Sequence, residues 1–211
     1  VLSRRQRQMC IRDSNSKLNI NVSDLIFEKP IKKKIYEDLE TKNFIPIIPE
    51  PDKVHLQNEF IVIENKTFNL NVETEIISNL QNIISKLDIN LTSEKGFPIF
   101  FQNDNQLLED QYSIQITKDN IEIKYNNYGG KLYGLISLVH LIDFYQTKLP
   151  ICTIQDNPKY QWRGMHLDCA RQFYTIDEIK RLFDYMVLFK LNRFHWHLTD
   201  NEAWRLSLIH I

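Results

Sequence analysis

Apolar residues recur along this chain at two spacings, and these spacings predict helices and strands. One set falls on a single helical face and predicts a helix that Thr74 caps, with Glu75 in its first turn: Ile76, Ile77, Leu80, Ile83, Ile84 and Leu87. A second set with the same spacing follows Gly129-Gly130 and predicts another helix: Leu132, Leu135, Ile136, Val139 and Ile142.

Short apolar or alternating runs in the same region predict strands. Four segments have this character: Phe60–Ile63, Phe97–Phe101, Tyr112–Thr117 and Ile121–Tyr125. The last two alternate between apolar and polar residues, and Lys118-Asp119-Asn120 between them predicts a hairpin with a three-residue loop. Residues 46–150 are therefore predicted to form a small α+β unit of antiparallel strands and two helices.

The pattern changes after the predicted turn Asp156-Asn157-Pro158. Apolar runs predict strands at Gly164–Ala170 and Phe194–Thr199. Between them, Thr175-x-x-Glu178 matches a capping box, and Lys190 is predicted to lie in the last turn of the helix that follows. The apolar face of that helix is predicted to be Ile176, Ile179, Leu182, Phe183, Met186 and Val187. A strand, a helix and a strand in this order predict a βαβ unit with parallel strands.

Composition narrows the class of protein. The chain is 43% hydrophobic and 25% charged, with a formal net charge of −1, which is typical of a folded soluble protein. This balance indicates neither nucleic acid nor an acidic membrane as a partner, and no run reaches the roughly 18–20 apolar residues of a membrane span. The cysteines Cys10, Cys152 and Cys169 are widely spaced, so we expect no disulfide framework and no zinc knuckle, with the last two buried.

The two ends of the chain differ from the rest. Residues 1–14 hold four arginines, whereas residues 15–162 hold none. We therefore expect residues 1–14 and Ser207–Ile211 to be foreign sequence, residues 15–45 to be a lead-in, and the chain to be an internal fragment. No signal peptide is visible, because no apolar segment follows the basic start.

Two carboxylates stand where a βα barrel carries its chemistry. Asp168 comes near the end of the first strand predicted after Pro158, and Asp200 follows the second. In such barrels the active site lies at the carboxyl ends of the strands. Asp200 could equally serve as a turn-forming or helix-capping residue, and position alone does not separate the two roles.

Histidines, tryptophans and one arginine are further candidates. His195 and His197 point to the same side of a strand and have a spacing that metal ligands can use, although a core or supporting role is favoured. Trp196 is expected in the core, and Trp204 is the better candidate for stacking on a ligand. Arg163 carries a fork of donors that suits hydroxyl or carboxylate recognition, or a surface ion pair.

The segments WRGMHLDCARQF (162–173) and KLNRFHWHLTDNEAWR (190–205) resemble family 20 glycoside hydrolases, the β-N-acetylhexosaminidases. Upstream, IIPEP (47–51) and DNIEIKYNNYGGKLYGLISLVHLI (119–142) resemble the small N-terminal domain of that family. The resemblance implies an α/β chain with an α+β N-terminal domain at residues 46–157. It also implies the first βαβ part of a truncated TIM (β/α)8 barrel at residues 158–211.

The resemblance also implies an activity. The family removes terminal non-reducing β-linked N-acetylglucosamine or N-acetylgalactosamine with retention of configuration, and the 2-acetamido oxygen of the substrate attacks the anomeric carbon. No cofactor or metal is implied. The Asp-Glu pair of the family lies after the fourth barrel strand, so this chain lacks it and is expected to be inactive alone.

Individual residues take family roles by the same resemblance. Asp200 matches a catalytic aspartate that supports the acid through a histidine. Arg163 matches an arginine that binds sugar hydroxyls, and His197 and Trp204 are expected at the substrate site. Asp168 is expected to be architectural. Gln172 departs from the histidine usual in the family, which leaves any polar contact there in doubt.

Two alternatives stay open. One is a metal-dependent barrel hydrolase that uses His195 and His197, and the other is a non-catalytic sugar-binding module. The family suggests a carbohydrate partner and an extracytoplasmic location, whether periplasmic, on the cell surface or secreted. The sequons at Asn21, Asn65 and Asn90 add little, because asparagine-rich sequence produces them by chance. Oligomeric state and the preference between the two sugars are not indicated.

Overall fold

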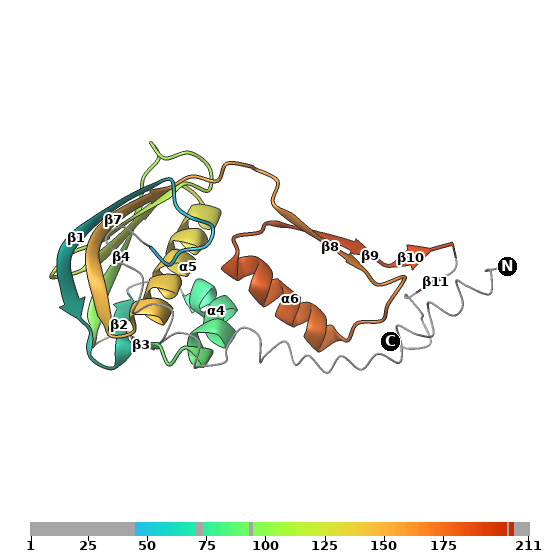
Figure 1. Ribbon diagram of the computed structural model, residues 1–211, viewed down its shortest axis with the longest axis horizontal. Coiled ribbons are helices and arrows are strands. Elements are labelled where there is room, and N and C mark those ends of the chain that lie inside the picture. Colours follow the sequence, from blue (N-terminus) through green and yellow to red (C-terminus); the bar gives the residue numbers. More distant parts are fainter. Residues whose placement is uncertain (1–44, 71–73, 93–94, 202, 205–211) are drawn as a thin grey trace, which may run out of the picture. The chain divides into compact units, whose positions relative to one another are not determined.

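The computed structural model describes residues 45–70, 74–92, 95–201 and 203–204. The predictions for residues 1–14, for most of the lead-in, for Cys10 and for Ser207–Ile211 lie outside the described residues. The described chain begins with an α+β domain and continues into a βαβ unit, as Figure 1 shows from blue to red. No helix of this described part combines the length and the hydropathy that a membrane span requires.

The α+β domain is built on one seven-stranded sheet with strand order β1-β7-β5-β6-β4-β2-β3. Its strands are β1 (Lys53–Val62), β2 (Thr67–Leu70), β3 (Asn90–Thr92), β4 (Phe97–Asn103), β5 (Tyr112–Ile116), β6 (Ile121–Tyr125) and β7 (Lys148–Asp156). A short 3-10 helix, η1 (Glu64–Lys66), separates β1 from β2.

The predicted hairpin is confirmed, because β5 and β6 pair antiparallel with Ile116 opposite Ile121. Its connection spans four residues, 117–120, because Thr117 is already outside the strand and donates its backbone N–H to Asn120 O.

The expectation of purely antiparallel strands is wrong. β2 pairs parallel with both β3 and β4, and β4 pairs parallel with β6. The physical reason is the connection: α4 (Thr74–Lys86) leads from β2 to β3, and a crossover helix joins parallel strands. The predicted helix over this segment is confirmed, whereas the predicted capping by the Thr74 side chain lies outside what the structure describes.

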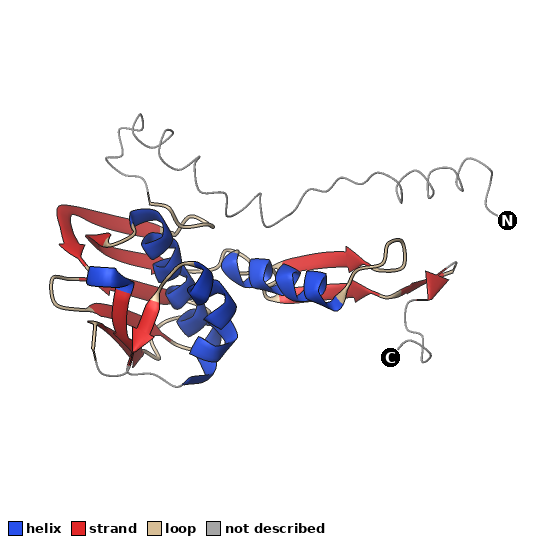
Figure 2. Cartoon of the chain, turned by 90° about the horizontal axis from the view of Figure 1, so that it is seen from below, coloured by secondary structure: helices blue, strands red, loops and turns tan. Residues whose placement is uncertain are grey.

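The second helix, α5 (Tyr128–Tyr145), lies with α4 on one face of the sheet (Figure 1; Figure 2). The predicted helix is confirmed, but it starts earlier than expected and includes Gly129 and Gly130, and the Asn127 side chain caps it by accepting from Gly130 N at 2.8 Å. The helix buries more than the one predicted face, because Leu138 and Leu141 are fully buried besides Ile136. Such burial on several sides makes α5 the centre of the hydrophobic core.

The second part of the described chain is the predicted βαβ unit. β8 (Gly164–Asp168) and β9 (Arg193–His197) pair in parallel, and α6 (Ile176–Leu188) joins them along one face (Figure 2). The capping box is confirmed: Glu178 N donates to Thr175 Oγ1 at 3.3 Å, and Thr175 N donates to Glu178 Oε2 at 2.7 Å. A small antiparallel pair, β10 (Thr199–Asp200) and β11 (Ala203–Trp204), follows.

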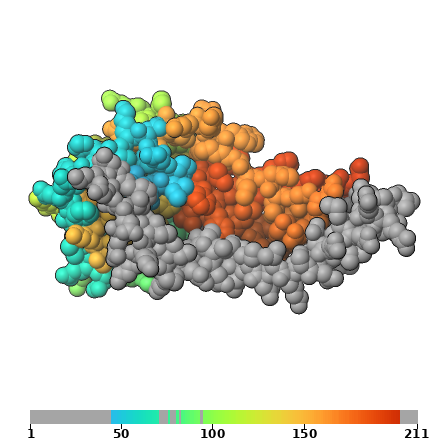
Figure 3. Space-filling view, viewed as in Figure 1, coloured from blue at the N-terminus to red at the C-terminus, as the bar shows by residue number. Residues whose placement is uncertain are grey.

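The apolar face of α6 is only partly covered. Ile179 and Met186 are buried, and Phe183 contacts Phe194 of β9 at 4.9 Å between ring centroids. Ile176 is 71% exposed, however, so its predicted place in a buried face is wrong. The surface of this unit, coloured orange to red, is visible on the face shown in Figure 3. The predicted fold class is confirmed as a mixed-sheet domain followed by a parallel βαβ unit.

Lys190 corrects another prediction. It does not lie in the last turn of α6, because that helix ends at Leu188 and Lys190 follows Phe189 with a left-handed φ of 58°. Its side chain is buried instead of facing the helix carbonyls. The side chain runs toward Asp156 and Tyr112 of the α+β domain.

Candidate functional site

Asp168 and His197 stand opposite each other at the carboxyl ends of the two parallel strands. Asp168 Oδ1 accepts from the backbone N–H groups of Ala170 at 3.0 Å and Arg171 at 3.1 Å, which closes the turn that leaves β8. The expected architectural role of Asp168 fits this turn. The same carboxylate also faces His197 Nδ1 at 3.7 Å.

A hydrogen bond to the backbone two residues further along the chain orients the ring of His197. Its Nε2 lies 2.6 Å from the carbonyl oxygen of Thr199, and that nitrogen carries the hydrogen, because a carbonyl can only accept. His197 therefore contacts Asp168 on one side and the residue before Asp200 on the other. It belongs to the same cluster as both aspartates.

Asp200 is held as an ionised carboxylate. The backbone N–H of Asn201 donates to its Oδ1 at 2.7 Å, and Arg171 Nη2 donates to its Oδ2 at 2.7 Å. These contacts, the Asn201 N–H first and Arg171 next, lower the pKa of Asp200 below its usual value. Such a carboxylate accepts hydrogen bonds and balances positive charge, but it is a poor general acid.

The structure adds Arg171 to the site, a residue that the sequence reasoning passed over. Its side chain is 73% exposed, and its guanidinium contacts Asp200 at 2.7 Å, with Asp168 Oδ2 at 3.9 Å from its Nε. The signal available in the sequence was its place three residues after Asp168, in a loop that leaves a strand at its carboxyl end.

Arg163 lies at the other end of the same strand. It precedes β8, and its Nε donates to Lys190 O at 2.8 Å while Nη2 pairs with Asp110 at 3.1 Å. Nη1 donates to Tyr160 O at 2.6 Å. The structure therefore brings Asp168, His197 and Asp200 together but does not bring Arg163 to them.

A row of histidines lines the face of the two strands that points away from α6. His166 of β8 is opposite His195 of β9, with ring centroids 4.6 Å apart, and His197 is 5.8 Å from His166. Because side chains alternate along a strand, Phe194 faces α6 and its neighbour His195 faces away. Within the described residues, no three His, Cys, Asp or Glu side chains are arranged to hold a metal ion.

The tryptophans and cysteines complete the surroundings. Trp196 was expected in the core but is 46% exposed, and its Nε1 donates to Cys169 Sγ at 3.1 Å. Trp204 pairs with Thr199 through its backbone, and its side chain lies outside what the structure describes. The prediction that Cys152 and Cys169 are buried is confirmed, and burial raises the pKa of the Cys152 thiol to about 12.

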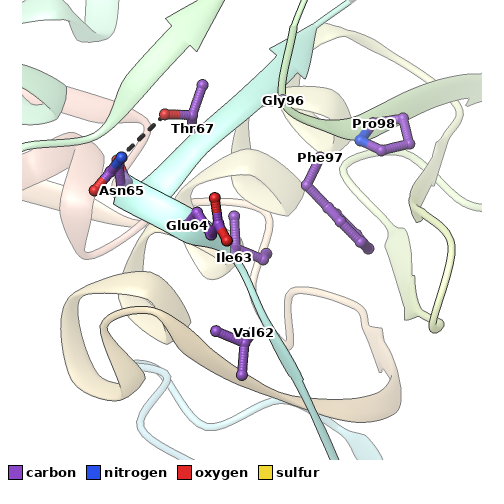
Figure 4. A pocket seen from close by; sticks show the side chains of 8 residues that line it. All are labelled: Val62, Ile63, Glu64, Asn65, Thr67, Gly96, Phe97 and Pro98. Carbon is purple, nitrogen blue, oxygen red and sulfur yellow. Dashed lines mark hydrogen bonds between the residues drawn. The ribbon is translucent and has the colours of Figure 1, made fainter.

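A cavity of about 390 Å³ opens in the α+β domain (Figure 4), lined by Val62, Ile63, Glu64, Asn65, Thr67, Gly96, Phe97 and Pro98. Among the described residues that line it, Glu64 alone has an ionisable side chain. Its lining comes from η1 and from strands of the α+β sheet, so it shares no residue with the aspartate and histidine cluster. We assign the candidate site to the ends of β8 and β9.

Two family models match consecutive parts of the chain. Glycosyl hydrolase family 20, domain 2, matches residues 45–157, and the catalytic domain of the same family matches residues 160–210.

Individual proteins are similar over the same parts. A beta-hexosaminidase B from Pseudoalteromonas piscicida is 30% identical over 173 residues, which cover 78% of this chain and 22% of that protein. An N,N'-diacetylchitobiase from Vibrio harveyi is 38% identical over 98 residues, which cover 46% of this chain and 11% of that protein. The chain thus spans about a fifth or less of the length of these two relatives.

Solved structures agree on the fold. A family 20 exo-beta-N-acetylglucosaminidase from Vibrio harveyi, in complex with N-acetylglucosamine, superposes with a TM-score of 0.67 at 27% identity. The match covers 77% of this chain and 27% of that one. A beta-N-acetylhexosaminidase from Bacteroides fragilis gives a TM-score of 0.64 at 25% identity, over 78% of this chain and 35% of that one.

Proposed function

This chain belongs to glycosyl hydrolase family 20, and we propose that a longer protein containing it removes terminal non-reducing β-linked N-acetylglucosamine or N-acetylgalactosamine from oligosaccharides or glycoconjugates. The observation that carries the proposal is Asp200, an ionised carboxylate held in a cluster at the carboxyl ends of β8 and β9. In βα barrels this end of the strands forms the substrate site. The alternatives, a metal-dependent hydrolase and a non-catalytic sugar-binding module, have no comparable support.

The proposed reaction is retaining and assisted by the substrate. The acetamido oxygen of the sugar attacks its own anomeric carbon, a protein acid protonates the leaving oxygen, and water then opens the cyclic intermediate. The acid and the carboxylate that orients the acetamido group would come from sequence beyond this chain. Asp200 would accept a hydrogen bond from a partner of that acid and stabilise positive charge on it.

We propose that Arg171, rather than Arg163, supplies the basic contact to the sugar. A guanidinium has five N–H donors. Arg171 donates one of them to Asp200, and its side chain remains largely exposed. The donors of Arg163 are directed to Asp110 and to two backbone carbonyls. His197 would hold the Thr199 carbonyl and the turn that carries Asp200, and Trp204 remains proposed as a sugar platform.

Two coarser proposals follow from the family. The boundary between its two domains would fall near Asn157, which the match of domain 2 to residues 45–157 supports. The protein would act outside the cytoplasm, in the periplasm, on the cell surface or after secretion.

The test measures kcat and KM of the longer protein on a chromogenic β-N-acetylglucosaminide. Asp200→Asn is expected to lower kcat by about 100-fold, because the general acid that Asp200 supports would lose at least the low end of its usual contribution. The matched control is Asp119→Asn, an exposed aspartate in the hairpin loop, which should leave both constants unchanged. Binding of N-acetylglucosamine without turnover would favour the sugar-binding module, and loss of activity to a chelator, restored by zinc, would favour the metal-dependent hydrolase.

A further inference from the structure

Lys190 carries a buried charge that the proposed reaction does not use. The residue is 5% exposed, and its Nζ donates to Asp156 Oδ2 at 2.9 Å and to Tyr112 Oη at 2.7 Å. Lysine is almost never fully buried unless it is paired. The position of Lys190 just after α6 therefore does not by itself explain why its side chain is buried and paired.

Each polar side chain in the network around Lys190 has at least one hydrogen-bond partner. Tyr112 donates its single proton to Asp156 Oδ2 at 2.7 Å, so the Ser137 hydroxyl at 2.6 Å must donate to Tyr112. The phenol oxygen thus accepts from Lys190 and Ser137 and donates to Asp156. Within the described residues, no buried side-chain N or O atom is left without a partner.

The members of this network come from both parts of the chain. Tyr112 lies on β5, Ser137 on α5, and Asp156 is the last residue of β7, all in the α+β domain. Lys190 belongs to the βαβ unit and stands three residues before β9. The ion pair therefore ties the start of β9 to the sheet of the α+β domain.

A second ion pair joins the start of β8 to the α+β domain. Arg163 immediately precedes β8 and pairs with Asp110 of the α+β domain at 3.1 Å, with its guanidinium over the Tyr133 ring at 5.2 Å. Its Nε also donates to Lys190 O at 2.8 Å, and its backbone N–H donates to Asn192 Oδ1 at 3.0 Å. The starts of both strands are thus joined to each other and to the same surface.

Because the ion pair of Lys190 and Asp156 lies in a buried place, losing one of its charges is costly. Burial lowers the pKa of Lys190, and the nearby Asp156 carboxylate opposes that shift. Removing one partner of a buried pair leaves an uncompensated charge, which costs far more than the pair itself contributes. The apolar contact of Val187 and Leu188 with the core of the α+β domain adds burial but does not fix an orientation.

We infer that the ion pair of Lys190 and Asp156 forms an interdomain lock that makes the βαβ unit and the α+β domain unfold as one cooperative unit. The ion pair of Arg163 and Asp110 reinforces this lock. The α+β domain is then the surface that positions β8 and β9. The inference goes beyond the proposed function and does not rest on it, because it concerns folding and is measured without a sugar.

The test is hydrogen exchange on the full 211-residue chain. Lys190→Met keeps the apolar stem and removes the charge, and Lys180→Met, at an exposed position of α6, is the matched control. Lys190→Met should raise the exchange rates of β8 and β9 at least about tenfold, while β5 and β6 keep their protection. Lys180→Met should change neither, and equal exchange in the two variants would overturn the lock.

A second variant covers the case in which Lys190→Met does not fold. Lys190→Met combined with Asp156→Asn removes both charges, so the α+β domain should regain its protection while β8 and β9 still exchange fast. If that double variant protects β8 and β9 as well as the original chain does, the charges do not hold the two parts together and the inference fails.

Discussion

Arg171 and Asp200 leave two neighbouring parallel strands and meet through a 2.7 Å contact between Nη2 and Oδ2. The Asn201 N–H holds the other oxygen of the same carboxylate at 2.7 Å. The Asn201 N–H and the Arg171 guanidinium thus both stabilise the ionised form of Asp200. Their contributions can be separated, because Arg171 can be replaced while the Asn201 N–H stays in place.

Replacing Arg171 by alanine should raise the pKa of Asp200 part of the way toward its usual value. The shift should stay incomplete, since the larger cause, the Asn201 N–H, remains. A pH titration of the carboxyl carbon of Asp200 by NMR measures this directly. Arg181→Ala, at an exposed position on α6, should leave that pKa where it is. An Asp200 pKa that does not respond to Arg171→Ala would show that the ion pair does not form in solution.

His140 should make the α+β domain sensitive to mild acid. Burial first, and the charge of Lys190 next, lower the pKa of His140 from 6.5 to about 4. Its Nδ1 accepts from Ile48 N at 3.4 Å, which only the unprotonated nitrogen can do. Between these two pKa values the unfolded chain binds the extra proton, so stability falls as the pH drops. The linkage amounts to about 3 kcal/mol over the whole window.

Urea unfolding as a function of pH tests this dependence. His140→Asn places an amide oxygen near the position of Nδ1 and carries no titrating group, so stability should vary less between pH 6.5 and 4. His55→Asn, at an exposed position on β1, should keep the original slope. The same slope in all three proteins would mean that His140 is protonated as easily in the folded chain as in the unfolded one.

The capping box of α6 should be worth a measurable part of the stability of the βαβ unit. Thr175→Ala removes the acceptor of the Glu178 N–H and should cost about 1 kcal/mol of unfolding free energy. Thr175→Ser keeps the hydroxyl and should be close to neutral. Because the Thr175 N–H lowers the pKa of Glu178, the contribution of the box should fade as the pH falls below the usual pKa of that carboxyl. Equal stability of the alanine and serine variants would contradict the capping role.

Local signals in the sequence were enough where the structure depends on neighbours along the chain. Thr175 and Glu178 are three residues apart, and the turn between β5 and β6 is equally local, so both could be predicted. The parallel pairing of β4 with β6 could not, because it depends on which distant strand fills the place beside β4.

In the candidate site, too, local features could be predicted from the sequence and long-range contacts could not. Asp168 and Asp200 were candidates because the end of a strand can be recognised from its own sequence, whereas His197 was expected at the site only through the family resemblance. Lys190 was misplaced, because its partners Asp156 and Tyr112 are 34 and 78 residues away and its location beside a helix end suggested another role. Distances along the chain of this size leave no periodic signal.

Tyr112→Phe should destabilise the chain although it deletes a single oxygen. That hydroxyl accepts from Lys190 and Ser137 and donates to Asp156, so its loss leaves two buried groups and one partly buried group each short of one partner. Leaving buried donors and acceptors unsatisfied costs about 1–3 kcal/mol, and denaturant unfolding measures the difference. Tyr160→Phe is the matched control, because Tyr160 is 74% exposed and should lose nothing measurable. If the two phenylalanine variants were equally stable, water would have to replace the Tyr112 hydroxyl in the network, and the lock would be looser than its hydrogen bonds indicate.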